Sequence, residues 1–261
     1  MLKFPLFVLL LVSFSGCNDG GFNVFSIDED VNLGKQFSLE IEAQPAAFPL
    51  LNKADYPEAY QHLNKITKSI LASNHILHRD DFQWEVNIID NDTILNAFCT
   101  PGGYIYVYTG LIKYLDSEDQ LAGVLGHEIA HADLRHSTKQ MTKGYGIGLV
   151  SKLIFGNNSI VGNVASSLAG LTFSRDDETE ADLQSVLYLY DTDYDPRGVA
   201  RFFQKMEAKG ETLGPLVFLS THPNPENRVE QIYDQWTKLG SKKGKTFKIE
   251  YADFKASLPS E

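Results

Sequence analysis

Two segments near the N-terminus carry hydrophobic residues every three or four positions, which is the spacing of one face of a helix. The first segment spans residues 26–43 and begins with Ser26 and Glu29, which have the spacing of a capping box. Two prolines end this helix, and the second segment spans residues 57–72. The apolar face of the second helix is formed by Ala59, Leu63, Ile66 and Ile70.

The pattern then changes to short apolar and alternating segments, which predict β-strands. Residues 84–88 alternate apolar with polar side chains, and residues 96–99 form a short apolar run. After a Pro-Gly-Gly turn, residues 104–109 are rich in aromatic and β-branched side chains, which favour a strand. Two interpretations of the alternating tyrosines stay open: a half-buried sheet face, or an edge along which an extended substrate pairs. These tyrosines are Tyr104, Tyr106 and Tyr108.

A third helix is predicted after Ser117, where Gln120 stands at the capping-box position. This helix contains the sequence His127-Glu128-Ile129-Ala130-His131. Histidines four residues apart project from the same side of a helix, so both imidazoles can reach a single Zn²⁺. Glu128 is then placed to act as general base toward a water on the metal. The segment therefore predicts the metal and the base of a zinc hydrolase.

A zinc ion held by two histidines needs a third protein ligand and an open position for water. Ser174 is predicted to cap a further helix, and on it Glu178 and Asp182 are four residues apart. One of these carboxylates can ligate zinc while the other accepts the free ring N–H of a ligand histidine. Glu180 points away from that face. The alternative interpretation is a solvated acidic helix start, which the aspartates preceding Glu178 resemble.

The composition changes this picture little. A chain of 261 residues can bury the full core of one catalytic domain. With 43% hydrophobic and 22% charged residues, it is typical of globular proteins. The formal charge of −11 argues against a nucleic-acid partner, which requires a basic surface. No internal repeat is visible, so a repeat-built scaffold is not expected.

The N-terminus has the pattern of a lipoprotein signal peptide, predicted over residues 1–16. Lys3 precedes an apolar run, and Cys17 follows a serine and a glycine. Cys17 is expected to become the lipidated first residue, with residues 17–25 as a tether. The alternative is an ordinary secretory signal in which this cysteine is incidental.

Three further features have no clear chemistry. Cys99 lacks a disulfide partner if Cys17 is lipidated, and it is interpreted as a buried apolar residue in preference to a catalytic thiol. Residues 144–171 are rich in apolar residues, but polar interruptions favour a buried helix pair or hairpin over a membrane span. Residues 241–261 are expected to be a C-terminal tail, strand-like over Phe247–Tyr251.

The order of these motifs resembles metallopeptidase family 48, the HtpX and CAAX prenyl protease family. The resemblance covers residues 25–235. It is based first on the His127–His131 motif and on the later pair Glu178 and Asp182. Further similar segments are Asn96-Ala97-Phe98, Pro101-Gly102-Gly103, Tyr106–Leu111, Phe173-Ser174-Arg175, Glu180-Ala181-Asp182 and Thr221–Arg228. We expect neither the transmembrane helices of the HtpX and prenyl protease branches nor the helical-repeat extension of BepA. The small periplasmic lipoprotein branch, which resembles LoiP and the protease domain of BepA, is therefore the expected type.

The resemblance implies a role for each residue of the site. The ligands of one zinc ion per chain would be His127, His131 and Glu178. Glu128 would be the general base, and Asp182 would orient a ligand histidine.

The resemblance also implies roles for residues outside the two motif helices. Arg228 would support the site. His222 matches a loop histidine that can approach the zinc and hold the enzyme inactive, and either it or a nearby tyrosine would stabilise the oxyanion. Without the family, His222 would be interpreted as a surface-loop residue. Asn96 and Ala97 are expected to bind substrate together with the three strand tyrosines.

The expected fold is α+β and zincin-like (gluzincin), with helices packed on a small mixed or antiparallel sheet over residues 26–240. The expected function is a zinc endopeptidase that cleaves unfolded or misassembled envelope proteins. It would be lipid-anchored in the cell envelope, preferentially at the outer membrane with the domain facing the periplasm. Its oligomeric state stays open. Two alternatives are a zinc-containing periplasmic chaperone or adaptor that binds without cleavage, and a metal hydrolase of small non-peptide amides.

Overall fold

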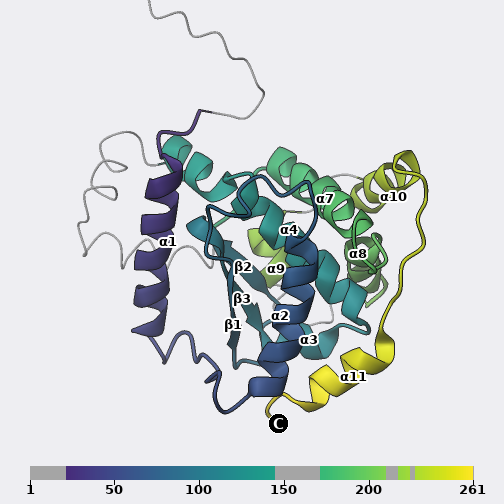
Figure 1. The fold of residues 1–261 in the computed structure, drawn as a ribbon, viewed down its shortest axis with the longest axis horizontal. Coiled ribbons are helices and arrows are strands. Elements are labelled where there is room, and N and C mark those ends of the chain that lie inside the picture. The colour runs from purple at the N-terminus through teal and green to yellow at the C-terminus, as the bar shows by residue number, and fades with distance from the viewer. Residues whose placement is uncertain (1–21, 145–170, 210–216, 224–226, 261) are drawn as a thin grey trace, which may run out of the picture.

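A computed structural model describes residues 22–144, 171–209, 217–223 and 227–260. A small three-stranded sheet lies between the helix α1 on one side and the helices α2 and α4 on the other (Figure 1). The strands are β1 (Glu85–Ile89), β2 (Ala97–Thr100) and β3 (Tyr104–Tyr108), with a 3-10 turn, η1 (Pro101–Gly103). The helices are α1 (Ile27–Glu42), α2 (Pro57–Leu71), α3 (Thr109–Tyr114), α4 (Glu118–Asp133), α7 (Arg175–Tyr190), α8 (Gly198–Lys209), α9 (Val217–Thr221), α10 (Arg228–Lys238) and α11 (Lys248–Ala256). The predicted α+β class is confirmed.

The two N-terminal helices begin where their sequence signals predict. The Ser26 side chain accepts a hydrogen bond from the backbone N–H of Glu29, and the Glu29 carboxylate accepts one from the N–H of Ser26. This reciprocal pair satisfies two of the unpaired donors at the start of α1. Pro57 occupies the first turn of α2, where its missing N–H has no cost.

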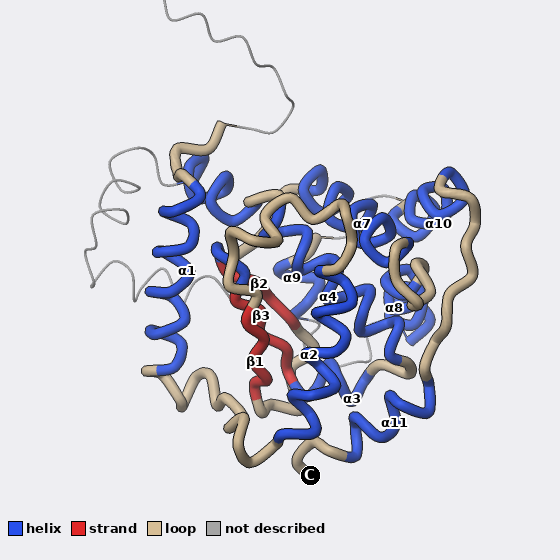
Figure 2. The backbone as a smooth tube through the Cα atoms, in the orientation of Figure 1, coloured by secondary structure: helices blue, strands red, loops and turns tan. Residues whose placement is uncertain are grey.

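The sheet has the strand order β1-β3-β2, so β3 is its central strand (Figure 2). β3 pairs in parallel with β1 and antiparallel with β2. The hypothesis that the tyrosine-rich strand offers a free edge to substrate is therefore wrong, because both of its edges are already hydrogen-bonded. Its alternating side chains instead divide between two cores: Ile105 and Val107 face α4, while the three tyrosines pack with Phe98 and Ile41 toward α1.

The helix α4 forms the centre of the larger core, and every one of its residues is buried. It packs against α7 and α8 along its length and against β2 at one side. The predicted capping box at its start is wrong. Ser117 makes no side-chain cap, and the Gln120 side chain accepts from the backbone N–H of Asp116 instead, at 2.9 Å.

The C-terminal region is helical where a strand was predicted. The strand hypothesis for Phe247–Tyr251 is wrong, because Lys248–Ala256 forms α11, which packs against α2 and α4. Tyr251 and Phe254 are fully buried in the larger core, and the Tyr251 hydroxyl donates to the Ile112 carbonyl at 2.7 Å. The domain boundary at residue 240 stays a prediction.

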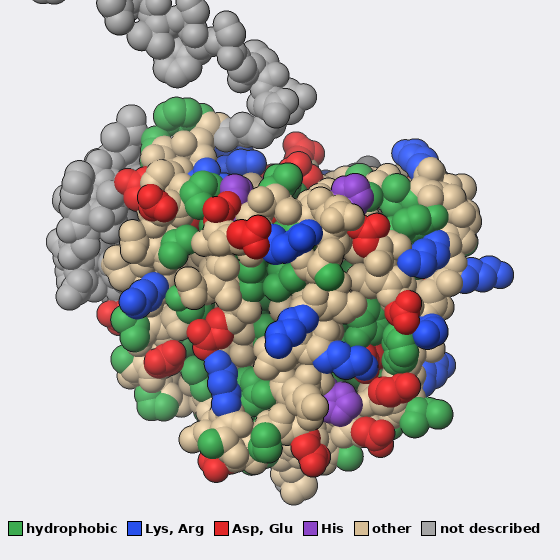
Figure 3. All heavy atoms as spheres, viewed as in Figure 1, with side chains coloured by type: hydrophobic (Ala, Val, Ile, Leu, Met, Phe, Trp, Pro, Cys, Tyr) green, Lys and Arg blue, Asp and Glu red, His purple; other side chains and the backbone are tan. Residues whose placement is uncertain are grey.

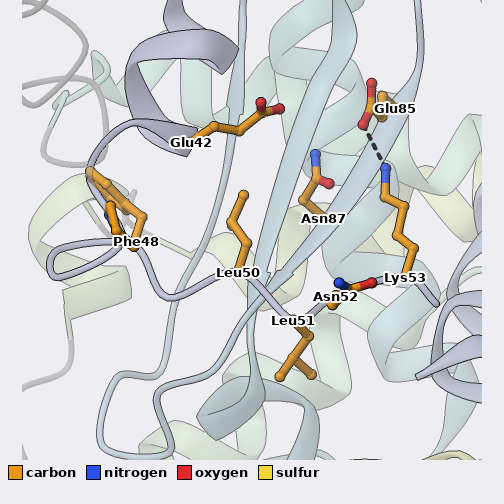
Figure 4. Close-up of a pocket in the computed structure, with 9 residues that line it drawn as sticks. Glu42, Phe48, Leu50, Leu51, Asn52, Lys53, Glu85 and Asn87 are labelled. Atoms are coloured by element: carbon orange, nitrogen blue, oxygen red, sulfur yellow. Dashed lines mark hydrogen bonds and ion pairs between the residues drawn. The ribbon is translucent and has the colours of Figure 1, made fainter. Parts of the chain in front are cut away.

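A hollow of about 530 Å³ opens on the face of the sheet that α1 covers (Figure 4). Glu42, Phe48 and Asn87 are among its lining residues, and Lys53 pairs with Glu85 at 2.6 Å on its rim. The Glu85 and Asn87 side chains alternate with those of Val86 and Ile88, which belong to the core shared with α4. The hollow therefore lies on the opposite side of the sheet from α4 and its histidines.

Some predictions fall outside the described residues. The signal peptide, Cys17 and most of the 144–171 apolar segment are among them. Within the described ranges, none of the helices combines the length and hydropathy that crossing a bilayer requires.

Candidate metal centre

The helix α4 brings its two histidines into contact on one face. The Nε2 atoms of His127 and His131 lie 3.0 Å apart, and both side chains are fully buried. Their rings meet edge to face, at an interplanar angle of 78°. The four-residue spacing therefore directs both imidazoles at one point, as the sequence predicts.

The helix α7 supplies a carboxylate to the same point. Glu178 Oε2 lies 3.5 Å from His127 Nε2, and Glu178 Oε1 lies 3.4 Å from His131 Nε2. His222, which follows the short helix α9, places its Nδ1 atom 3.0 Å from Glu178 and 3.2 Å from His127. One ligand atom from each of these four residues falls within 4.8 Å of the others. This cluster is compatible with a metal ion.

The donor set fits a tetrahedral metal ion. Ligands at about 2.1 Å from zinc are separated from one another by about 3.4 Å, close to the histidine–glutamate distances above. His127 Nδ1 donates to the Asp182 carboxylate, so the lone pair of His127 Nε2 faces the cluster, 3.0 Å from Nε2 of His131. A cation at this point would accept that lone pair. Two histidines and one glutamate form a known donor set of catalytic zinc.

Asp182 holds the far side of His127, as predicted. Its Oδ1 atom lies 2.8 Å from His127 Nδ1, so the carboxylate accepts the ring N–H and leaves Nε2 free for a metal. Arg228 donates to both oxygens of Asp182, at 2.5 and 2.9 Å, and to Glu178 at 2.9 Å. The guanidinium thereby fixes both α7 carboxylates in register with α4. It also lies 3.7 Å above the Phe203 ring.

Glu128 lies between the histidine cluster and the strand β2. Its Oε1 atom is 3.4 Å from His222 Nε2 and has no hydrogen-bond partner among the described residues. Burial raises the pKa of Glu128 to about 7, although the charge of His222 and a hydrogen bond to the Cys99 backbone oppose this change. A carboxylate with a pKa near neutrality, beside a metal position, is suited to accept and return a proton.

In the metal-free protein, the surrounding groups determine the charges of the candidate ligands. Burial lowers the pKa values of His127 and His131, which keeps both rings neutral and able to ligate. Burial by itself would raise the pKa of Glu178, but His222 and the two ligand histidines hold it well below its usual range. Burial by itself would lower the pKa of His222, but the charges of Glu128 and Glu178 raise it.

The predicted substrate residues divide into two groups. Asn96 and Ala97 are buried at the start of β2, the outer strand on the side of Glu128. Tyr104, Tyr106 and Tyr108 are buried on the opposite face of the sheet, away from the histidines. Burial raises the pKa of Tyr108 to about 12. A role for the tyrosines as oxyanion donors therefore has no support in this geometry.

Two neighbours of the cluster were not predicted. His136 lies 2.8 Å from the far nitrogen of His131, and the Phe173 ring stacks on His131 with centroids 3.9 Å apart. His136 has only its position as a signal, five residues after the motif, whereas Phe173 belongs to the Phe173-Ser174-Arg175 segment of the family resemblance. The cluster itself is enclosed, and the histidines visible on the surface in Figure 3 belong to other parts of the chain.

His127, His131 and Glu178 are buried together, and Glu128 follows His127 on α4. In an α+β domain, this arrangement defines a metallopeptidase site of the His-Glu-x-x-His class. Residues 57–235 match Peptidase family M48, and the chain belongs to this family. The resemblance identified from the sequence is thereby confirmed.

Named relatives come from mitochondria and from bacteria. The chain is similar to the mitochondrial metalloendopeptidase OMA1 of Arabidopsis thaliana, with 35% identity over 64% of this chain and 34% of the relative. It is similar to OMA1 of Schizosaccharomyces pombe, with 28% identity over 82% of this chain and 63% of the relative. The beta-barrel assembly-enhancing protease of Escherichia coli K12 is 26% identical over 79% of this chain and 44% of the relative. The chain spans less than two thirds of the length of each.

Glu128 should make the stability of the metal-free protein depend on pH. Its pKa is about 7 in the folded state against an ordinary value of 4.5, so the folded state retains a proton that the unfolded state has lost. As pH rises from the ordinary pKa to the folded-state pKa, the wild type becomes less stable because its folded state must lose this proton. The free energy of unfolding should fall by about 3 kcal/mol more in the wild type than in Glu128→Gln, which cannot titrate. Denaturant unfolding with chelator from about pH 4 to about pH 8 measures the difference. The same pH dependence in both proteins would contradict the shift.

Proposed function

We propose that this protein is a zinc endopeptidase. The observation that carries the proposal is the position of Glu128, whose Oε1 atom makes no hydrogen bond to the described residues and lies beside four convergent ligand atoms. A structural zinc site has no need of a buried base, whereas hydrolysis of an amide does. The His-His-Glu donor set favours zinc over Mg²⁺ or Ca²⁺, which prefer oxygen ligands.

The chain's own residues account for the proton transfers. Zinc, when held by His127, His131 and Glu178, would act as a Lewis acid toward the scissile carbonyl and make water more acidic. Glu128 takes the proton of the attacking water and delivers it to the leaving amine. In the metal-free protein, burial raises the pKa of Glu128 to about 7.

His222 has two compatible roles in this site. With Nδ1 near Glu178 and Nε2 near Glu128, it occupies the space that water and substrate would need. In this position His222 acts as a latch that holds the enzyme inactive. Displaced from it, the same imidazole could donate a hydrogen bond to the oxyanion of the intermediate.

The substrate is proposed to bind along the outer edge of β2. The Tyr108 N–H donates to the Asn96 carbonyl, so Phe98 and Thr100 also face β3, while Ala97 and Cys99 present their backbone groups outward. The Cys99 backbone hydrogen-bonds Glu128, so the proposed base lies beside this edge. An extended chain can pair with such an edge irrespective of its side chains. This mode of binding favours unfolded proteins as substrates.

Backbone pairing predicts a sensitivity to N-methylation. In a model peptide, methylating the one amide that pairs with the Ala97 carbonyl should lower kcat/KM about tenfold, through a lost hydrogen bond and a steric clash. Scanning a single N-methyl group along the peptide identifies that position. Replacing side chains at the same positions by alanine is the control and should have smaller effects. A uniform response along the scan would argue against strand pairing.

Two other functions remain for the test to exclude. A zinc-containing periplasmic chaperone or adaptor would bind unfolded proteins without cutting them, and a hydrolase of small amides would not need the β2 edge. The intact Glu128 disfavours the first, and the outward-facing backbone groups of β2 beside it disfavour the second.

Glu128→Gln should separate the base from the metal. The substitution keeps the shape of the side chain, so zinc should remain at one per chain, while degradation of an unfolded model protein falls by at least about 100-fold. Zinc content and cleavage are measured on the same samples, with and without chelator. Retained cleavage in this variant would refute the role of Glu128.

His222→Ala distinguishes a latched protease from a chaperone if the wild type binds zinc without cleaving. Gained activity in this variant supports the latch, and continued binding without cleavage supports the chaperone. Activity in both proteins would show that His222 does not limit access.

We further propose that the protein acts in the bacterial cell envelope, anchored by lipid on Cys17 and preferentially at the outer membrane facing the periplasm. Its substrates would be unfolded or misassembled envelope proteins, which agrees with the name of the beta-barrel assembly-enhancing relative. A single acyl chain binds membranes only weakly, so stable anchoring requires multiple acyl chains.

The anchor predicts incorporation of a labelled fatty acid into the full-length chain. Cys17→Ser should abolish the label and release the protein from the membrane fraction, whereas Cys99→Ser, which alters the buried cysteine, should retain both. Label that persists in Cys17→Ser would contradict lipidation at Cys17, because the fatty acid would then be attached elsewhere.

A further inference from the structure

His131 has a buried partner on its far side that differs in kind from the partner of His127. Its Nδ1 atom lies 2.8 Å from Nδ1 of His136, and His136 is 1% exposed. The Nε2 atom of His136 lies 3.2 Å from a carboxylate oxygen of Glu180. A continuous path of hydrogen bonds therefore runs from His131 through His136 to the helix α7.

The chain reaches this arrangement by a sharp turn after α4. Arg135 adopts a left-handed conformation with φ of 60°, and the next helical segment begins at His136. The Arg135 guanidinium donates to Asp30 and to the Phe25 carbonyl, each at 2.5 Å. These contacts fix the turn against the N-terminal region. As a result, His136 points back at α4 instead of following its helical path.

With His136 neutral, only one direction of the protons satisfies both hydrogen bonds. If His131 presents the lone pair of Nε2 to a metal, its Nδ1 carries hydrogen and donates to His136 Nδ1. His136 then carries its own hydrogen on Nε2 and donates it to Glu180, which can only accept when ionised. The hydrogen bond from His136 lowers the pKa of Glu180, which favours the ionised form.

We propose that His136 and Glu180 form a positioning pair that holds His131 in the tautomer and orientation needed to bind the metal. The proposal rests on the proposed function in that it assumes a metal at the His127–His131 site. Through this pair, α7 supports each ligand histidine with a carboxylate: Asp182 acts directly on His127, and Glu180 acts on His131 through His136.

Packing around His131 complements the pair. Phe173 stacks on one face of the His131 ring with an interplanar angle of 18°, so the ring is held in its plane. Stacking alone leaves the ring free to turn over by 180° about its bond to Cβ, which exchanges the positions of nitrogen and carbon atoms. The hydrogen bond to His136 prevents that exchange, because a carbon atom would otherwise face the acceptor.

The test is the affinity of the metal-free full-length protein for zinc, measured by competition with a chromogenic chelator. His136→Phe keeps an aromatic ring but removes the acceptor, and it should weaken zinc binding by about 10- to 100-fold. His136→Asn restores an acceptor oxygen at the δ position, so its affinity should lie within a few-fold of wild type. The exposed His75 provides a matched control, and His75→Phe should bind zinc as the wild type does.

Glu180 gives a second measurement that does not disturb the core, because its side chain is 56% exposed. Glu180→Ala should weaken zinc binding several-fold. Asp176→Ala, which removes another exposed carboxylate from α7, should leave it unchanged. Circular dichroism of each metal-free protein establishes that it is folded.

Wild-type affinity in folded His136→Phe would overturn the positioning pair, as would equal weakening by the Phe and Asn variants. If His136→Phe does not fold, the comparison of Glu180→Ala with Asp176→Ala decides, and equal affinities there overturn the proposal. Failure of the wild type to bind zinc would refute the proposed function itself. Zinc binding and cleavage by the wild type with unchanged affinity in these variants would refute the pair alone.

Discussion

The close approach of α4 and α7 is the constraint on which the whole site depends. A Cβ atom at Gly126 would lie 2.7 Å from Ser185 Oγ and 2.9 Å from Leu189 Cδ1. The Ser185 hydroxyl donates to the Gly123 carbonyl at 2.8 Å, which ties the two helices together at the level of these glycines. Because Gly126 has no side chain, Ser185 and Leu189 of α7 pack directly on the backbone of α4, and the carboxylates of α7 reach the histidines of α4 nearby.

Burying charged groups at this contact is costly unless each is paired. Glu178 and Asp182 share the guanidinium of Arg228, and each also contacts a histidine of α4. Arg228 comes from α10, so a third helix is required to balance the charges of the other two. Ion pairs between three helices that are distant in sequence thus offset the cost of burying these charges. The same ion pairs hold the helices together.

The local parts of this arrangement could be predicted from the sequence, and the non-local parts could not. The spacing of His127 and His131, and of Glu178 and Asp182, fixes which side chains share a helix face. Strand order depends on contacts between distant segments, so the central position of β3 was missed. The C-terminal helix was missed because burial of Tyr251 and Phe254 against α2 and α3, and not local propensity, determines its structure.

His136 illustrates a third kind of failure. Helical periodicity places a residue five positions after His131 on a different side of α4, but the left-handed residue at Arg135 ends that periodicity. The contact with His131 therefore depends on a backbone turn fixed by Asp30, a residue of α1. Arg135 is unremarkable in the sequence, since a positive φ is not associated with arginine.

Metal binding and folding should be linked in such a site. Without a cation, the cluster brings together imidazole lone pairs, an ionised Glu178 and a Glu128 whose charged form is penalised by burial. A bound cation compensates these groups at once and binds only the folded arrangement, so its binding free energy adds to the stability of the α4–α7 contact. The helix packing that assembles the ligands and the ion that they bind therefore stabilise each other. This reciprocity explains how a protein can keep so many polar side chains in its core.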